Sequence, residues 1–144
     1  MSGLADLSAA DLADCVALFV ATFAAPPWEE TWEPADAHCR LEDFHRTPRS
    51  HGVTLRDGTG LLLGFALGHR ERFGPDDHFL LKEMCVRAAV QGIGHGSTLL
   101  GGLTARMPDV SHWHLLTARD SPAAGFYARH GFRPAGRIGL FVRP

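Results

Sequence analysis

The sequence predicts one α/β domain spanning residues 1–144, and three observations support this fold class. The length of 144 residues is that of one ordinary domain, and a chain of this size hides roughly 70% of its unfolded surface. Segments with helical and with strand-like periodicity alternate along the chain. No linker or low-complexity tract divides them. The middle segments are expected to form a parallel, right-handed strand–helix–strand unit.

The N-terminal third predicts two helices. Ser8 and Asp11 have the spacing of a capping box, and apolar residues then recur at helical spacing over residues 12–23. A pair of prolines ends this helix. The second helix is expected from about residue 34 to residue 45, before the next proline.

The middle third predicts a hairpin, a strand and a helix. Residues 53–56 and 61–70 flank the sequence Asp-Gly-Thr-Gly, which favours a tight hairpin turn. Residues 79–86 form a third apolar run, and we expect it to be the next strand. Residues 97–107 carry four large apolar side chains on one helical face, and a proline stops that helix.

The C-terminal third continues the alternation. Residues 113–118 predict a strand, and the next helix begins with Ser121 as its N-cap and a proline at its first position. Gly131 has the place of the left-handed residue that ends a helix. Two short strands are expected after it, at residues 132–135 and 138–142.

Charge and cysteine content narrow the classes of function. The net charge of −2 argues against binding a phosphate backbone. The three cysteines are far apart and form no C-x-x-C pair, which is typical of reduced thiols in a cytosolic protein. No Lys or Arg precedes Arg40, and the apolar stretches are shorter than the ~20 residues of a membrane span. We therefore expect a cytoplasmic protein that binds neither nucleic acid nor membrane.

A glycine-rich turn joins the predicted strand at residues 79–86 to the following helix. Its three alternate glycines, in the sequence Gln-Gly-Ile-Gly-His-Gly from residue 91, let the backbone turn several N–H groups toward one point. A helix N-terminus adds free donors, so the turn is suited to a pyrophosphate. Tight strand–helix packing is the alternative reason for such glycines. A dinucleotide-binding turn would instead have the spacing G-x-G-x-x-G, and no Lys-Ser or Lys-Thr pair follows as in a P-loop.

In two motifs the chain resembles the GCN5-related N-acetyltransferase (GNAT) family. The family's acetyl-CoA signature Q/R-x-x-G-x-G/A is met by Gln91, Gly94 and Gly96. An aromatic-Tyr pair followed by Gly-Phe is met by the sequence from Phe126 to Phe132. The resemblance implies a mixed, mostly antiparallel sheet with helices on both faces, whose central parallel strands splay apart to form the acetyl-CoA cleft. The family's first strand is reduced here at most to residues 4–7.

The resemblance also implies which residues contact acetyl-CoA, the expected co-substrate. Backbone groups of Met84 and Val86 would pair with the pantetheine arm as an added strand does, and the Met84 N–H would face the thioester carbonyl. Gln91 would frame the loop. Backbone N–H groups would hold the pyrophosphate, and these belong to Gly92, Gly94, Gly96 and Ser97.

Two catalytic residues follow from the same resemblance. Tyr127, the only tyrosine, would protonate the leaving thiolate, although its ring could instead serve helix packing. Glu83 would take the proton of the acceptor amine, with a water chain, His112 or His114 as alternatives. Because strand residues alternate in direction, Glu83 and Met84 should point to opposite faces unless a bulge shifts the alternation. No metal is expected, since His112 and His114 share a face without a third ligand at suitable spacing.

The acceptor side is expected in the connection between the first two helices. Trp28 and Trp32 lie there among acidic residues, a mixture that suits a cationic amine, although both rings could instead belong to the core. The sequence thus predicts an N-acetyltransferase that moves an acetyl group directly to a primary amine of a small molecule or peptide. A non-catalytic acyl-CoA-binding module is the alternative. A monomer or a homodimer is expected, with a final strand near Phe141 as a candidate interface.

Overall fold

A computed structural model describes residues 3–143 of the chain. The sheet has five strands in the order β1-β2-β3-β4-β5; β1 to β4 are antiparallel and β4 pairs with β5 in parallel. The helices and strands in chain order are β1 (Gly3–Asp6), α1 (Leu12–Ala24), α2 (Pro34–Arg46), β2 (Ser50–Arg56), β3 (Leu62–Phe73), β4 (Asp76–Val86), α3 (His95–Ala105), β5 (His112–Leu115) and α4 (Pro122–Arg129). Short 3-10 turns lie at Ala9–Asp11 and Ala88–Val90.

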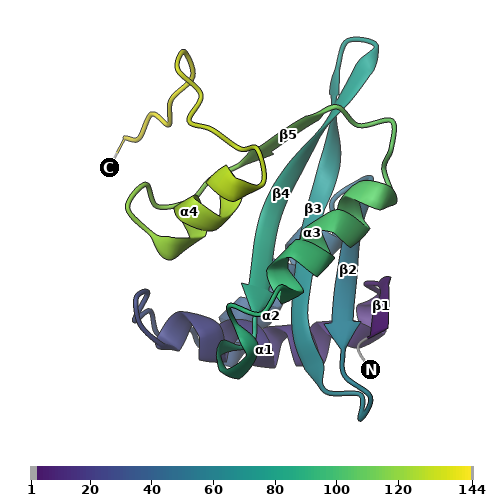
Figure 1. Cartoon of the computed structure of the whole chain (residues 1–144), viewed down its shortest axis with the longest axis vertical. Coiled ribbons are helices and arrows are strands. Elements are labelled where there is room, and N and C mark those ends of the chain that lie inside the picture. The colour runs from purple at the N-terminus through teal and green to yellow at the C-terminus, as the bar shows by residue number, and fades with distance from the viewer. Residues whose placement is uncertain (1–2, 144) are drawn as a thin grey trace.

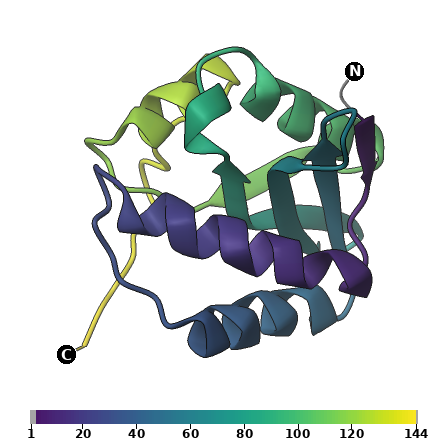
Figure 2. The same cartoon turned by 90° about the horizontal axis from the view of Figure 1, so that it is seen from below.

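The molecule has three layers. Helices α1 and α2 cover one face of the sheet, while α3 covers the other and α4 lies on the same side as α3, near β5 (Figures 1 and 2). Each face has its own apolar core. Cys15, Phe19 and Leu41 are buried on the α1–α2 side, whereas Leu99 and Leu103 are buried on the α3 side. The predicted α/β class and the mixed, mostly antiparallel sheet are confirmed.

Most local signals are confirmed at the positions where they occur. The Ser8 backbone N–H donates to the Asp11 carboxylate over 2.8 Å at the entrance to α1. The Ser121 hydroxyl accepts the Ala124 N–H over 3.2 Å and caps α4. Gly131 adopts φ +89°, the left-handed geometry expected after a helix. Within residues 3–143, no helix is long and apolar enough to cross a membrane.

Several predicted boundaries were wrong. β3 and β4 are longer than expected and meet in a hairpin whose tip projects beyond the rest of the sheet (Figure 1). α3 begins at His95 instead of Ser97, and β5 ends at Leu115 instead of residue 118. The strands expected at residues 132–135 and 138–142 are not formed. Alternating apolar residues form a strand only when a neighbouring strand accepts their backbone hydrogen bonds, and Phe141, 95% exposed, packs on no such neighbour.

A β-bulge in β4 decides where the side chains near its end point. On β3, Leu67 lies opposite Glu83 and Gly68 lies opposite Leu81, so Lys82 is an extra residue without an opposite partner. Before the bulge, Phe79 and Leu81 pack on the α3 side. After it, Met84 and Val86 take that side, and Cys85 packs on the α1–α2 side. The sequence left this change of alternation open.

We expect the strand pairing beside the bulge to tolerate no side chain at Gly68. A Cβ there would lie 2.7 Å from the Phe79 ring and would also collide with the Leu80 carbonyl oxygen. Gly68→Ala should therefore lower the free energy of unfolding by about 1–3 kcal/mol, measured by urea denaturation. Gly101→Ala is the matched control: this helical glycine has open space around it, so alanine should stabilise by about 0.5–1 kcal/mol. Equal effects of the two substitutions would contradict this packing.

Candidate active site

An unpaired edge of β4 forms the centre of the candidate site. β5 pairs with β4 only from His78 to Leu81, whereas β4 continues to Val86. In the described part of the chain, the edge of β4 beyond Leu81 therefore has no strand beside it on the β5 side. Free strand edges accept an extended ligand through backbone hydrogen bonds. Met84 and Val86, which the sequence assigned to the cofactor arm, lie on this segment.

The glycine-rich turn follows directly and is built around left-handed backbone. Gly92 has φ +82° and Gly94 has φ +98°, conformations that favour glycine. Gly94 is the N-cap of α3, and its carbonyl accepts the first helical hydrogen bond, from the Thr98 N–H over 3.0 Å. The N–H groups from Gly94 to Ser97 precede that bond and are thus the free donors of the helix N-terminus. Gln91 closes the turn by donating from Nε2 to the Val86 carbonyl over 2.9 Å.

Gly96 has a separate reason to be glycine. A Cβ at this position would lie 2.9 Å from the Phe126 ring, so α3 and α4 approach closely there. A second contact joins the same two helices: Ser97 Oγ lies 2.9 Å from His130 Nε2. His130 Nδ1 lies 2.9 Å from the Phe126 carbonyl, which only accepts, so Nδ1 carries a proton. In the neutral ring, Nε2 then accepts from the Ser97 hydroxyl. The Ser97–His130 contact was not predicted, because nothing local in the sequence relates the two residues.

Tyr127 projects from α4 toward the α3-side core. Its ring packs against the apolar cluster that includes Met84 and Val86, and it meets Phe126 and Phe132 edge-on at centroid distances of 5.3 and 5.6 Å. Burial raises the pKa of the Tyr127 hydroxyl well above its ordinary value, and the negative charge of Glu83 raises it further. The phenol is therefore protonated at neutral pH. The ring therefore takes part in packing, and the hydroxyl carries its proton.

Glu83 lies on the opposite side of β4 and is paired with an arginine from α2. Arg40 donates from Nε and from one terminal nitrogen to Glu83 Oε1, each over 3.0 Å. The Glu83 side chain is 9% exposed, and this burial raises the pKa of its carboxyl. The Arg40 charge counteracts part of that rise. The sequence analysis did not single out Arg40, since 43 positions separate it from Glu83.

Aromatic rings surround the Glu83–Arg40 pair. The Arg40 guanidinium lies over the Phe44 ring at 4.8 Å and over the Trp32 ring at 5.6 Å. Trp32 also packs edge-on against buried Phe19, so it belongs partly to the core and partly to this pair. Trp28 contacts Phe23 of α1, at 5.6 Å between ring centroids, and no contact joins it to Glu83 or Arg40 among the described residues.

The two histidines of β5 lie away from Glu83. His112 is opposite His78, and His114 is opposite Leu80, on the paired part of the two strands. His114 Nε2 lies 2.8 Å from His78 Nδ1, and Phe73 stacks on the His78 ring. Within residues 3–143 no group of three or more potential ligands has a geometry suited to a metal ion.

Comparison with known proteins connects this geometry to a family. Residues 17–132 match the family model described as "Acetyltransferase (GNAT) family". No match was found among curated proteins. Among solved structures, a possible acetyltransferase from Clostridium difficile 630 superposes with a TM-score of 0.82 at 7% identity, covering 100% of this chain and 98% of that one.

Two further structures of similar fold have names that specify an acceptor. One is a ribosomal-protein-alanine N-acetyltransferase from Brucella melitensis biovar Abortus 2308, with a TM-score of 0.73, 15% identity and 99% coverage of both chains. The other is an aminoglycoside acetyltransferase from an uncultured soil metagenomic sample, with a TM-score of 0.74, 15% identity, and coverage of 100% of this chain and 98% of that one. At 15% identity, the similarity to these two structures shows a shared fold and not a shared acceptor.

The burial of Glu83 predicts a pH-dependent contribution to stability. Because its folded-state pKa is raised above 4.5, the folded protein binds this proton more tightly than the unfolded chain does. Ionisation of Glu83 therefore costs the folded protein no stability below pH 4.5. The free energy of unfolding falls as pH rises from 4.5 to the raised pKa of Glu83, and the loss is complete above that pKa. We expect the stability of Glu83→Gln relative to the parent to increase with pH over that interval and then level off, measured by urea denaturation at a series of pH values.

Exposed Glu29→Gln controls for the removal of one negative charge. A stability difference between Glu83→Gln and the parent that is independent of pH, or that falls as pH rises, would contradict the raised pKa.

Proposed function

The chain belongs to the GNAT family of acetyltransferases, and on this premise we propose that it transfers an acetyl group from acetyl-CoA to a primary amine of a small molecule or peptide. We propose that residues 1–144 form the single domain that carries out this reaction. The observation that carries the proposal is the unpaired edge of β4. The helix N-terminus with its free donors lies at the end of this edge, and the partly buried Tyr127 and the buried Glu83 lie on its two sides.

Acetyl-CoA fits the residues around this edge. Met84 and Val86 offer backbone groups to an extended pantetheine arm. The Met84 N–H is our candidate donor to the thioester carbonyl, as the resemblance to the family implies. The Val86 carbonyl already accepts a hydrogen bond from Gln91. The left-handed Gly92 and Gly94 suit an anion, and they turn the loop so that backbone donors, including those of Gly96 and Ser97, face a pyrophosphate.

The proposed reaction is a direct transfer. Glu83, acting itself or through water, accepts a proton from the acceptor ammonium, since only a neutral amine is nucleophilic. The amine nitrogen then bonds to the thioester carbon, and the Met84 N–H stabilises the oxyanion that forms. When the carbon–sulfur bond breaks, the leaving sulfur receives the proton of Tyr127. The cationic nitrogen of the new amide loses its second proton, which restores the Tyr127 hydroxyl through solvent. The raised pKa of Tyr127 keeps the phenol protonated at neutral pH, which a proton donor requires.

Arg40 is proposed to keep the base ionised. Its charge lowers the pKa of a carboxyl that burial raises, so it favours the form of Glu83 that can accept a proton. The rings around this pair, Trp32 and Phe44, are the proposed walls of the acceptor site, with Trp28 at a greater distance along the connection. The fold does not identify the acceptor. One structural neighbour is named a ribosomal-protein-alanine N-acetyltransferase, and another is named an aminoglycoside acetyltransferase.

The first test measures thiol release from acetyl-CoA with a panel of primary amines. We expect Tyr127→Phe to lower kcat by about 100-fold or more, because a general acid contributes roughly that factor, while the Kd for acetyl-CoA stays unchanged. The substitution keeps the ring that packs between Phe126 and Phe132. A parent protein that binds acetyl-CoA but acetylates no amine would instead support a non-catalytic acyl-CoA-binding module.

The second test concerns Arg40. Removing its charge should raise the pKa of Glu83, so Arg40→Gln should move the acidic limb of the kcat/KM profile to higher pH. Arg40→Lys, which keeps the charge, should move it less. Arg46→Gln, an exposed arginine on the same helix, is the matched control. A profile that is identical in Arg40→Gln and the parent would remove Arg40 from the proposed mechanism.

A further inference from the structure

Lys82, the extra residue of the β4 bulge, is the only lysine of the chain. Besides the N-terminal amine, its Nζ is therefore the one primary amine that a chain of this sequence offers to an acyl donor. β5 pairs with β4 as far as Leu81, so Lys82 is the first residue of the unpaired edge. It lies where β4 and β5 separate, at the end of the edge along which the pantetheine arm is proposed to lie.

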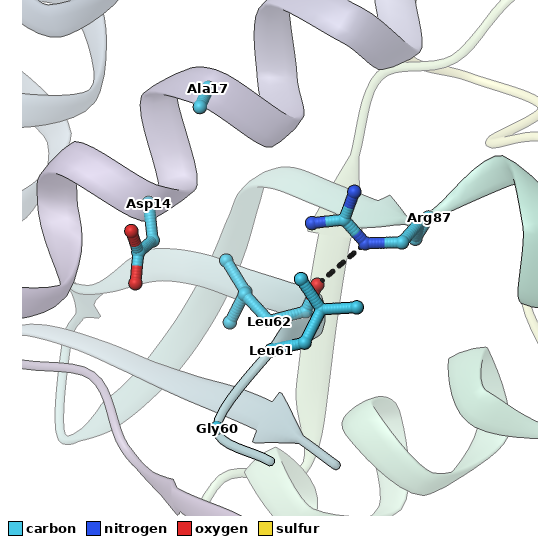
Figure 3. Close-up of a pocket in the computed structure, with 6 residues that line it drawn as sticks. All are labelled: Asp14, Ala17, Gly60, Leu61, Leu62 and Arg87. Atoms are coloured by element: carbon cyan, nitrogen blue, oxygen red, sulfur yellow. Dashed lines mark hydrogen bonds between the residues drawn. The ribbon is translucent and has the colours of Figure 1, made fainter.

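The other end of the unpaired edge is anchored by an arginine. Arg87 follows β4, and its backbone N–H donates to the Leu63 carbonyl over 2.7 Å. Its Nε donates to the Leu62 carbonyl over 2.9 Å (Figure 3). A guanidinium is not deprotonated in proteins, whereas a lysine ammonium can lose a proton and become a nucleophile. Of the two cationic side chains at the ends of this edge, only Lys82 can accept an acetyl group.

The bulge directs the Lys82 side chain to the same side of the sheet as Glu83. Lys82 Nζ lies 5.4 Å from the centre of the Phe44 ring on α2. Arg40, the partner of Glu83, lies over the same ring at 4.8 Å. In a regular strand two consecutive residues would point to opposite faces, so the bulge brings the amine and the proposed base to one helix.

Only a weak contact holds the Lys82 ammonium over the ring. None of the ion pairs among residues 3–143 includes Lys82, although its side chain is half-buried. A cation–π contact of a partly exposed ammonium is weak, and the four-carbon stem of lysine is flexible. Met84 is two residues further along β4, about 7 Å away along the strand. A thioester carbonyl that accepts from the Met84 N–H is thus within reach of Lys82.

We propose that Lys82 is a self-acetylation site, at which Nζ takes the acetyl group of acetyl-CoA bound to the same chain. The inference rests on the proposed function, because it uses the same thioester, base and acid. Glu83 accepts one proton from the Nζ ammonium, and the nitrogen then bonds to the thioester carbon. The carbon–sulfur bond breaks with its electron pair on sulfur, which receives the Tyr127 proton. The second proton of the nitrogen restores Tyr127 through solvent, and the products are acetyl-lysine and the free thiol of coenzyme A.

The test incubates the full chain with acetyl-CoA and no other amine, followed by intact mass measurement and peptide mapping by tandem mass spectrometry. We expect one acetyl group per chain, located at Lys82, and release of an equal amount of thiol that stops when Lys82 is consumed. Lys82→Arg keeps the positive charge but removes the amine, so it should show neither. A parent chain that remains unmodified at Lys82, including one acetylated only at its N-terminus, would overturn the proposal.

Spontaneous acetylation by acetyl-CoA is the competing explanation, and a second lysine in the same chain measures its rate. Arg72→Lys places an amine at an exposed position near the tip of the β3–β4 hairpin. We expect acetylation at Lys82 to be about 100-fold or more faster than at position 72, because general acid–base catalysis contributes roughly that factor. Tyr127→Phe should lower the rate at Lys82 to a similar extent. Equal rates at the two positions, or a rate at Lys82 that Tyr127→Phe leaves unchanged, contradict self-acetylation.

Two further readouts separate self-acetylation from related reactions. At saturating acetyl-CoA, transfer within one chain proceeds at a rate constant that is independent of protein concentration. A rate constant proportional to protein concentration would indicate transfer between chains and overturn the proposal. The panel of primary amines separates this inference from the proposed function: a chain that acetylates an external amine but not Lys82 overturns self-acetylation alone, whereas a chain that acetylates neither overturns both.

Discussion

Lys82 occupies a position in β4 that has no opposite residue on β3, and the side-chain directions of the whole candidate site depend on this one extra residue. In a regular strand Glu83 would share a face with Phe79 and Leu81, against α3. The bulge instead turns Glu83 toward α2, where Arg40 meets it, and turns Met84 toward the core under Tyr127. Glu83 and Tyr127 lie on opposite sides of β4 only because the alternation changes between Leu81 and Glu83.

The second constraint is the early end of β5, which leaves the last five residues of β4, 82–86, without a parallel partner. Contacts between its borders, and not a strand, span this part of the molecule. Gln91 holds the Val86 carbonyl, the Phe126 ring fills the space above Gly96, and His130 binds Ser97. These contacts join the glycine-rich turn to α4, so the helix that carries Tyr127 and the turn suited to pyrophosphate form one unit.

Local signals predicted much of this arrangement. Caps at Ser8 and Ser121, apolar spacing in α1 and the Asp-Gly-Thr-Gly turn each depend on residues a few positions apart, and the structure confirms all four. Expectations that depended on distant partners were less reliable. The apolar alternation at residues 138–142 suggested a strand, but no neighbouring strand pairs with it, and the Arg40–Glu83 pair had no local signal at all.

The sequence by itself determined the fold class, the order of most elements and the two motifs that indicate the family, because periodicity, caps and glycine geometry act over short distances along the chain. Only the tertiary structure decided on which face of the sheet Glu83 lies and which residue forms an ion pair with it. It also decided that Gly96 must lack a side chain. Each of these depends on atoms that are remote in sequence and adjacent in space. Packing and electrostatics act through spatial distance, and the fold alone sets that distance.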